Sequence, residues 1–216
     1  MKDTIINKTI NFVKTTLENA EGGHDWFHVE RVYKIAKTIA IKEKADLFII
    51  ELAALLHDIA DSKFYNGDES IGPKMAKNFM DMHKINSEIQ AHVLAIIKNI
   101  SFKNSFDKNT FTSLEYKIVQ DADRLDSIGA IGIARAFNYG GFKNRGLYNP
   151  EIIPNLNLTK EEYKKSAAPT INHFYEKLLL LKDLMNTKTG KEMAEKRHLF
   201  MEEYLNQFYS EWEGKA

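Results

Sequence analysis

The sequence contains no cysteine among its 216 residues. The chain therefore forms no disulfide and offers no thiolate to a metal, and this composition suits a reducing compartment. Lysine plus arginine and aspartate plus glutamate both number 30, so no excess of positive charge indicates a nucleic-acid-binding surface. Any metal site must be built from histidine, aspartate and glutamate.

Long apolar segments are also lacking. The longest runs lie around LFII and LAALL, and Glu51 separates them. No window reaches the length of a transmembrane helix, and the N-terminal segment lacks the apolar stretch of a signal peptide. We therefore expect a cytoplasmic protein with no membrane partner.

Apolar residues recur at helical spacing along most of the chain, and no pair of strands is evident. Asp25 and Asp46 are predicted to cap helices over residues 26–42 and 46–60. Long helices are also predicted at 168–185 and 190–213. Capping-box spacings mark three further helix starts: Ser87 with Gln90, Thr112 with Glu115, and Thr159 with Glu162. The predicted fold class is all-α.

Two segments, 101–110 and 138–157, are predicted to be loops. The second is rich in glycine, asparagine and proline. Loops of this length in compact domains often cover a ligand, although an ordinary surface excursion explains the composition equally well.

The segment LLHDIAD places His57, Asp58 and Asp61 in an apolar helix. Burying such groups is costly unless they find partners. Neighbouring helical residues and residues four apart can face one site, so the three side chains are predicted to converge. A buried histidine bonded to an aspartate would explain this segment taken alone.

Two further polar clusters interrupt apolar helices. GHDWFHVERV carries His24, His28 and Arg31, and VQDADRLD carries three aspartates and one arginine. Each of these three polar clusters is hard to explain by itself. Together they are explained as the surroundings of one buried divalent cation with nitrogen and carboxylate ligands.

These clusters resemble the HD-domain metal-dependent phosphohydrolases: a histidine at a helix start, a His-Asp pair on a second helix, and a distant aspartate inside DADR. The resemblance extends over GHDWFHVERV, LLHDIADSKF, DADRLDSIGAIGIARAF, HFYEKLLLLKDLMNT and the closing R-x-x-F-M…EW-G. The resemblance covers nearly the whole chain, and in these segments the chain is similar to stand-alone bacterial HD-domain proteins of this size. It implies one all-α domain, with a metal-binding core at about 22–137 and C-terminal helices at about 159–213 packing on it.

The resemblance implies four ligands for one metal ion: His28, His57, Asp58 and Asp123. His28 is preferred to His24 because H-x-x-x-V-x-x-x-A begins there, and Asp123 is preferred to Asp121 because the family's last ligand lies in A-D-R or A-D-K. Mn²⁺ is the favoured ion, with Mg²⁺, Co²⁺, Ni²⁺, Fe²⁺ and Zn²⁺ as alternatives. Few histidines remain for a second metal, which favours one.

Two residues are predicted to act on protons. Asp61 is expected to orient or deprotonate the attacking water, or alternatively to support His57 from outside the coordination sphere. His24 is expected to protonate the leaving oxygen, or alternatively to cap the helix beside Gly22 and Gly23.

Phosphate binding requires fixed cations. Arg124 adjoins a predicted ligand, or else pairs with Asp121 or Asp126. His92 reaches substrate, or else is a satisfied core residue. The full set predicted to bind substrate phosphate is Arg31, Lys63, His92, Arg124, Arg145 and Lys177. For the last two, a solvated surface charge is the competing explanation.

The predicted function is hydrolysis of a small phosphorylated molecule, preferably a nucleoside triphosphate cleaved to monophosphate and pyrophosphate. The rivals are a phosphodiesterase or 5′-nucleotidase on the same site, a metal-holding nucleotide sensor without turnover, and a di-iron oxygenase. No nucleic-acid polymer is expected as a partner, and a homodimer is left open.

Overall fold

The computed structural model describes residues 2–18, 20, 25–60, 68, 70–100, 111–157, 159, 162 and 166–215. Throughout these ranges the regular structure is helical, with no strand, which confirms the predicted all-α class. The chain divides into two compact units, Met1–Ala122 and Asp123–Ala216. The division falls inside the segment expected to be the metal-binding core, and the single-domain organisation stays a prediction.

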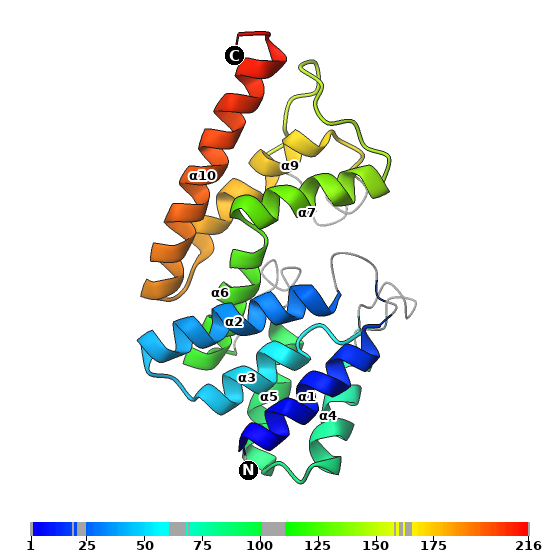
Figure 1. The fold of residues 1–216 in the computed structure, drawn as a ribbon, viewed down its shortest axis with the longest axis vertical. Coiled ribbons are helices and arrows are strands. Elements are labelled where there is room, and N and C mark those ends of the chain that lie inside the picture. Colours follow the sequence, from blue (N-terminus) through cyan, green and yellow to red (C-terminus); the bar gives the residue numbers. More distant parts are fainter. Residues whose placement is uncertain are drawn as a thin grey trace. The chain divides into compact units, whose positions relative to one another are not determined.

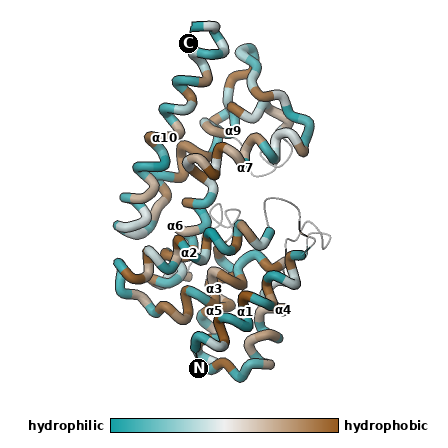
Figure 2. Tube along the Cα trace, viewed as in Figure 1, coloured by the Kyte–Doolittle hydropathy of each residue, from teal (hydrophilic) through white to brown (hydrophobic). Residues whose placement is uncertain are grey.

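The first unit is built around one apolar helix. Its elements are α1 (Lys2–Thr16), α2 (Trp26–Glu43), α3 (Leu47–Leu56), α4 (Ile71–Met82), α5 (Ser87–Asn99) and most of α6 (Leu114–Asp126). Helix α3 packs against α1, α2 and α5, and hydrophobic colour covers most of its length (Figures 1 and 2). Because α3 is surrounded, nearly all of its residues are buried, including Glu51.

Glu51 is the charged residue that interrupts the apolar runs, and α2 supplies its partners. Its Oε1 accepts a hydrogen bond from the Tyr33 hydroxyl at 2.9 Å and lies 2.8 Å from the Lys37 ammonium. These contacts offset the cost of burying the carboxylate.

The second unit contains α7 (Gly129–Phe142), α9 (Thr170–Glu176), a 3₁₀ helix η3 (Leu178–Leu184) and α10 (Lys188–Trp212). Helix α10 packs on α7 and η3, and α9 also packs on α7 and η3 (Figure 1). Aromatic rings fill the space between these helices: Phe137 and Tyr204 each lie about 6 Å from Phe174, at 5.9 and 6.0 Å between centroids.

Several predicted helix ends are wrong. Helix α3 ends at Leu56 rather than Ala60, and His57 is its C-cap residue. The helix predicted at 168–185 breaks at Lys177 and continues as η3. Leu178 and Leu181 are both buried in η3, and a spacing of three is the repeat of a 3₁₀ helix.

The loop predicted at 138–157 begins later, because α7 continues through Phe142. A β-carbon added to Gly140 would lie 2.2 Å from the Thr170 hydroxyl oxygen. Glycine at this position therefore serves close packing of α7 against the start of α9 and does not mark the helix end.

The predicted caps of α2 and α3 are confirmed. The Asp25 carboxylate accepts from the His28 backbone N–H at 2.9 Å. The Asp46 carboxylate accepts from the backbone N–H groups of Phe48 and Ile49. Both helices therefore begin where the sequence predicts.

Two of the predicted capping boxes are wrong by one residue. Asn86, not Ser87, caps α5, and Ser113, not Thr112, accepts the hydrogen bond of the Tyr116 backbone N–H at 3.0 Å. In each case the neighbouring residue also carries a short polar side chain that can cap a helix.

The third predicted box is confirmed. The Glu162 carboxylate accepts from the Thr159 backbone N–H at 2.8 Å, and the Thr159 hydroxyl accepts from the Glu162 N–H at 3.3 Å.

No helix in the described ranges is both long enough and apolar enough to cross a membrane.

Candidate metal centre

His28 lies in the first turn of α2 and is buried. The Asp25 cap fixes where this helix starts and so fixes the direction of the third helical residue. Val29 and Val32 lie on the buried side of the same helix. The imidazole is therefore held by a helix start whose position the sequence determines.

His57 is the C-cap residue of α3, and its ring contacts the last turn of that helix. Its Nδ1 lies 2.8 Å from the carbonyl oxygen of Ala54. A carbonyl oxygen only accepts hydrogen bonds, so Nδ1 carries the proton and the lone pair resides on Nε2. A backbone carbonyl on the far ring nitrogen is the usual support of a metal-binding histidine.

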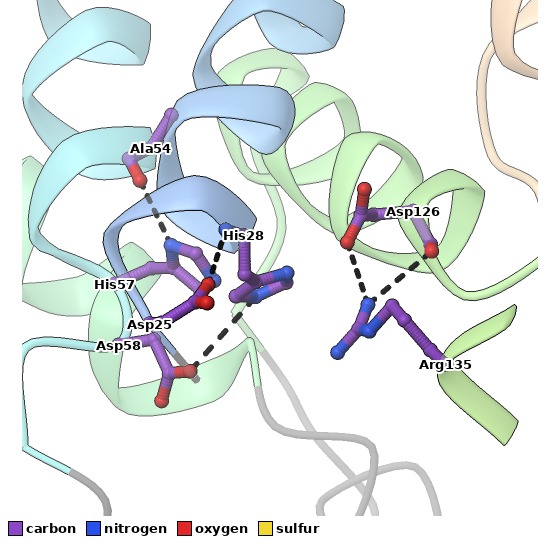
Figure 3. A network of polar contacts seen from close by, with 7 residues as sticks. All are labelled: Asp25, His28, Ala54, His57, Asp58, Asp126 and Arg135. Carbon is purple, nitrogen blue, oxygen red and sulfur yellow. Dashed lines mark hydrogen bonds and ion pairs between the residues drawn. The ribbon is translucent and has the colours of Figure 1, made fainter. Parts of the chain in front are cut away.

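Asp58 follows immediately, and the three side chains point toward one another (Figure 3). The His28 and His57 rings meet edge-on with centroids 5.4 Å apart, and Nε2 of His28 lies 3.9 Å from Oδ2 of Asp58. Each residue offers one ligand atom, and the three atoms lie within 4.8 Å of one another. This is the one group of its kind among the described residues.

This donor set fits a divalent metal. Two imidazole nitrogens and one carboxylate oxygen suit first-row transition metals, and small side-chain movements would bring all three to bonding distances of about 2.0–2.2 Å. Three protein ligands also leave coordination positions for water or substrate.

The comparisons with known proteins agree with this geometry. Residues 26–128 match the HD domain family model. An HD-superfamily hydrolase from Bacillus thuringiensis, known from its crystal structure, is 46% identical and superposes with a TM-score of 0.80 over 99% of each chain. The chain belongs to the HD-domain family.

Two further comparisons concern the protein YpgQ of Bacillus subtilis. By sequence it is 41% identical over 207 residues, which cover 94% of this chain and 91% of that protein. The crystal structure of YpgQ in complex with ADP superposes with a TM-score of 0.75 and 37% identity over 97% of this chain and 96% of that one. Family membership and the hydrolase from Bacillus thuringiensis support a metal-dependent phosphohydrolase.

The HD-domain match ends near the C-terminus of α6, where the third polar cluster lies. Asp121 is fully buried in the first unit. Asp123 is half-buried and belongs to the second unit, so its place as the fourth ligand stays a prediction.

Asp126 has a partner on α7 that the sequence did not indicate. Its buried carboxylate accepts from Arg135 on α7 at 2.6 Å, and the same guanidinium also reaches its backbone carbonyl at 3.2 Å (Figure 3). Arg197 on α10 donates to the carbonyl of Leu125. Burial lowers the pKa of Arg197, and the charge of Asp126 opposes that shift. The end of α6 is thereby fastened to two helices of its own unit.

Two of the residues predicted to bind phosphate, His92 and Arg124, make other contacts. The Nε2 of His92 lies 2.8 Å from the Ser113 hydroxyl and 3.6 Å from the Glu115 carboxylate. Arg124 donates to the carbonyl of Leu184. Arg31 is half-buried on α2, one turn after His28. Their phosphate-binding roles stay predictions, and these contacts place His92 and Arg124 in structural roles as well.

Arg145 and Lys177 lie in the second unit together with His173, which the sequence analysis did not single out. Burial, together with the charges of Lys177 and Arg145, lowers the pKa of His173 to about 3. The sequence feature that could have pointed to His173 is its position four residues before Lys177 in HFYEKL. Three other predicted site residues, His24, Asp61 and Lys63, lie outside the described residues.

Proposed function

We propose that this HD-domain protein is a nucleotide pyrophosphohydrolase that cleaves a nucleoside or deoxynucleoside triphosphate into monophosphate and pyrophosphate. The observation that carries the proposal is the group of His28, His57 and Asp58, whose donor atoms lie within 4.8 Å of one another. The complex of YpgQ with ADP supports a nucleotide as the ligand class. Mn²⁺ is the ion we favour.

A divalent ion held there would lower the pKa of a bound water and polarise a phosphoryl oxygen. His28, His57 and Asp58 would hold it, with Asp123 as the proposed fourth ligand. The Nδ1 proton of His57, directed at the Ala54 carbonyl, keeps the Nε2 lone pair on the metal side. Arg31 and Lys63 would hold the phosphates against the charge that develops during attack.

The proposed reaction forms one bond and breaks one bond. Water attacks the α-phosphorus in line, and the bond from that phosphorus to the oxygen bridging the α- and β-phosphates breaks. Asp61 accepts the proton of the attacking water, and His24 donates a proton to the departing pyrophosphate oxygen. Each proton removed at one end is thus replaced at the other.

The experiment begins with protein stripped of metal and reloaded separately with Mn²⁺, Mg²⁺, Co²⁺, Ni²⁺ or Zn²⁺. Each form is incubated with nucleoside mono-, di- and triphosphates and cyclic dinucleotides, and anion exchange resolves the products. Monophosphate plus pyrophosphate from a triphosphate is the expected result.

Other products would contradict the proposal in identifiable ways. Orthophosphate from a monophosphate would identify a 5′-nucleotidase, and a linear dinucleotide would identify a phosphodiesterase. Bound nucleotide without any product would identify a sensor. A further sample reloaded with Fe²⁺ would identify a di-iron oxygenase by an oxygen-dependent optical signal.

A further inference from the structure

A cavity of about 300 Å³ lies between the loop that follows α7 and the helices α9 and α10. Isoleucine and proline side chains within residues 150–154 form one wall, and α9 contributes Asn172 and Tyr175. Tyr148 of the loop and Tyr209 of α10 complete the aromatic part of the lining. Ligand pockets usually have volumes of about 300–1,000 Å³, so this cavity would hold a small ligand of one or two rings.

The loop wall of this cavity is fixed by hydrogen bonds to α9. The Asn172 side-chain N–H donates to the carbonyl of Ile152 at 2.9 Å, and the Asn155 backbone N–H donates to the Glu176 carboxylate at 3.1 Å. Within the loop, the Ile152 backbone N–H donates to the carbonyl of Asn149 at 3.1 Å. The cavity is therefore formed before any ligand binds, which lowers the ordering cost of binding.

Asn172 is 1% exposed, and its carboxamide can form more hydrogen bonds than it does. Ile152 uses one of its two side-chain N–H groups. No residue in the described ranges donates to its side-chain oxygen or accepts from its second N–H, so an acceptor and a donor remain side by side in one plane. Desolvated polar atoms without partners are costly, and a ligand that pairs with them offsets this cost.

The lining of the cavity restricts the chemistry of the ligand. The described residues that line it include no charged side chain, and burial together with a hydrogen bond to Tyr175 raises the pKa of Tyr209, which keeps that phenol neutral. An ionised ligand would lose its hydration here without gaining a counterion. A purely apolar ligand would leave the Asn172 carboxamide unpaired. Because aromatic walls favour flat partners, the ligand that fits is a neutral planar ring with a donor beside an acceptor.

We propose that this cavity binds a neutral heterocycle of the nucleobase type, held by the Asn172 carboxamide and the tyrosine rings. A carboxamide pairs with the edge of adenine through two hydrogen bonds: its oxygen accepts from the amino group, and its N–H donates to the neighbouring ring nitrogen. Stacking on aromatic side chains stabilises bases in general. The inference does not rest on the proposed function, because it concerns an uncharged ligand and residues of the second unit alone.

The first experiment titrates the protein with adenine at pH 7 and follows the assigned side-chain amide resonances of Asn172 by NMR. Adenine should produce saturable shifts of these resonances. Purine has the same rings but lacks the amino group, and it should bind about tenfold more weakly because one hydrogen bond is missing. An absent shift, or equal affinity for adenine and purine, would overturn the proposal.

Ile153→Ala tests the apolar wall. It removes contact area from the ligand and should weaken adenine binding about threefold or more. The Ile153 side chain is 83% exposed, so its truncation should leave the fold intact. Leu156→Ala is the matched control, because Leu156 is 65% exposed on the same loop and does not line the cavity. The same affinity in both variants would exclude this cavity as the site.

Asn172→Ala separates recognition of the ligand from support of the wall. If the carboxamide pairs with the ligand, the ratio of adenine affinity to purine affinity should fall from about ten to about one. A merely structural role would lower both affinities and leave the ratio unchanged, and that result would overturn the assignment. Helical circular dichroism checks the fold of each variant. Ile153→Ala keeps the test decisive if Asn172→Ala does not fold.

Two sources would supply such a ring: the base of a nucleotide, and a free base or nucleoside. Steady-state kinetics of the metal-loaded protein separate them. Adenine that competes with a nucleoside triphosphate would identify the base of the nucleotide, and adenine that binds without competing would identify a separate ligand. Adenine binding without nucleotide cleavage would refute the proposed function and leave this site standing. Nucleotide cleavage without adenine binding would do the reverse.

Discussion

The Nε2 atom of His28 and the Oδ2 atom of Asp58 lie 3.9 Å apart, one at the start of α2 and the other just beyond the end of α3. The two helices pack on each other, and local contacts fix the relevant end of each. The Asp25 cap begins α2, and the ring of His57 meets the last turn of α3. A shift of either end by one residue would turn its donor by about 100°.

The convergence of His28, His57 and Asp58 predicts what happens when one of the two imidazole rings is removed. His57→Ala should abolish metal retention, measured by elemental analysis after gel filtration, because one of two nitrogen donors is lost. Helical circular dichroism should stay near that of the parent protein, since His57 follows α3 and contributes no residue to its buried interior. His83→Ala, at the C-cap of α4, is the matched control. Full metal content in His57→Ala would remove this residue from the ligand set.

Asp61→Asn should separate metal binding from chemistry. Asparagine retains the size of aspartate but is not a base, so the metal should remain while turnover falls by about 10²–10⁴-fold. The comparison is of kcat at saturating metal and nucleotide, with metal content measured on the same sample. Unchanged turnover would assign Asp61 to support of His57 instead.

Asp126 predicts a stability effect in the second unit. Its carboxylate is 1% exposed and its partner Arg135 is 26% exposed. Asp126→Ala should lower the free energy of unfolding by about 3 kcal/mol, the lower end for a broken buried pair, because Arg135 is partly solvated. Urea unfolding measures this change.

The matched control is Lys188→Ala, which breaks an exposed pair and should change stability by less than about 1 kcal/mol. A similar small effect of Asp126→Ala would show that the contact with Arg135 contributes little. Arg135→Met combined with Asp126→Ala should recover part of the loss, since the charge of Arg135 is then no longer left without its counterpart.

His173 predicts a pH dependence of stability. Its pKa is about 3 in the folded chain against 6.5 for an ordinary histidine, because of burial and the charges of Lys177 and Arg145. Between these values the unfolded chain binds a proton that the folded chain does not. Stability from this group is therefore fully present above pH 6.5 and decreases as the pH falls, by at most about 1.4 kcal/mol per pH unit.

The measurement is urea unfolding of the parent and of His173→Asn from pH 7.5 down to pH 4.5, in buffer without phosphate. The difference between the two unfolding free energies should narrow as the pH falls, because asparagine does not titrate. If the difference in unfolding free energy stays constant across this pH range, the His173 ring takes up its proton equally in the folded and the unfolded chain.

The sequence alone determined the fold class and limited the kinds of side chain that could bind a metal. Helical spacing of apolar residues predicted an all-α fold, and the absence of cysteine restricted ligands to histidine and carboxylates. The start of α2 was predictable because the Asp25 carboxylate accepts a hydrogen bond from a backbone N–H only three residues further along the chain. Helix starts at Asn86 and Ser113 were misplaced by one residue, because two adjacent short polar side chains compete for the same capping role.

Tertiary structure decided what depends on contacts between distant segments. The glycines of α7 suggest a loop in sequence but remain helical because Gly140 packs against Thr170. Asp126 pairs with Arg135 on the next helix, and the positive charge of the loop residue Arg145 contributes to lowering the pKa of His173 on α9. Local hydrogen bonds and spacing act over a few residues and can be predicted from order alone. Pairings of charges depend on which helix faces meet, and that is set only when the chain packs.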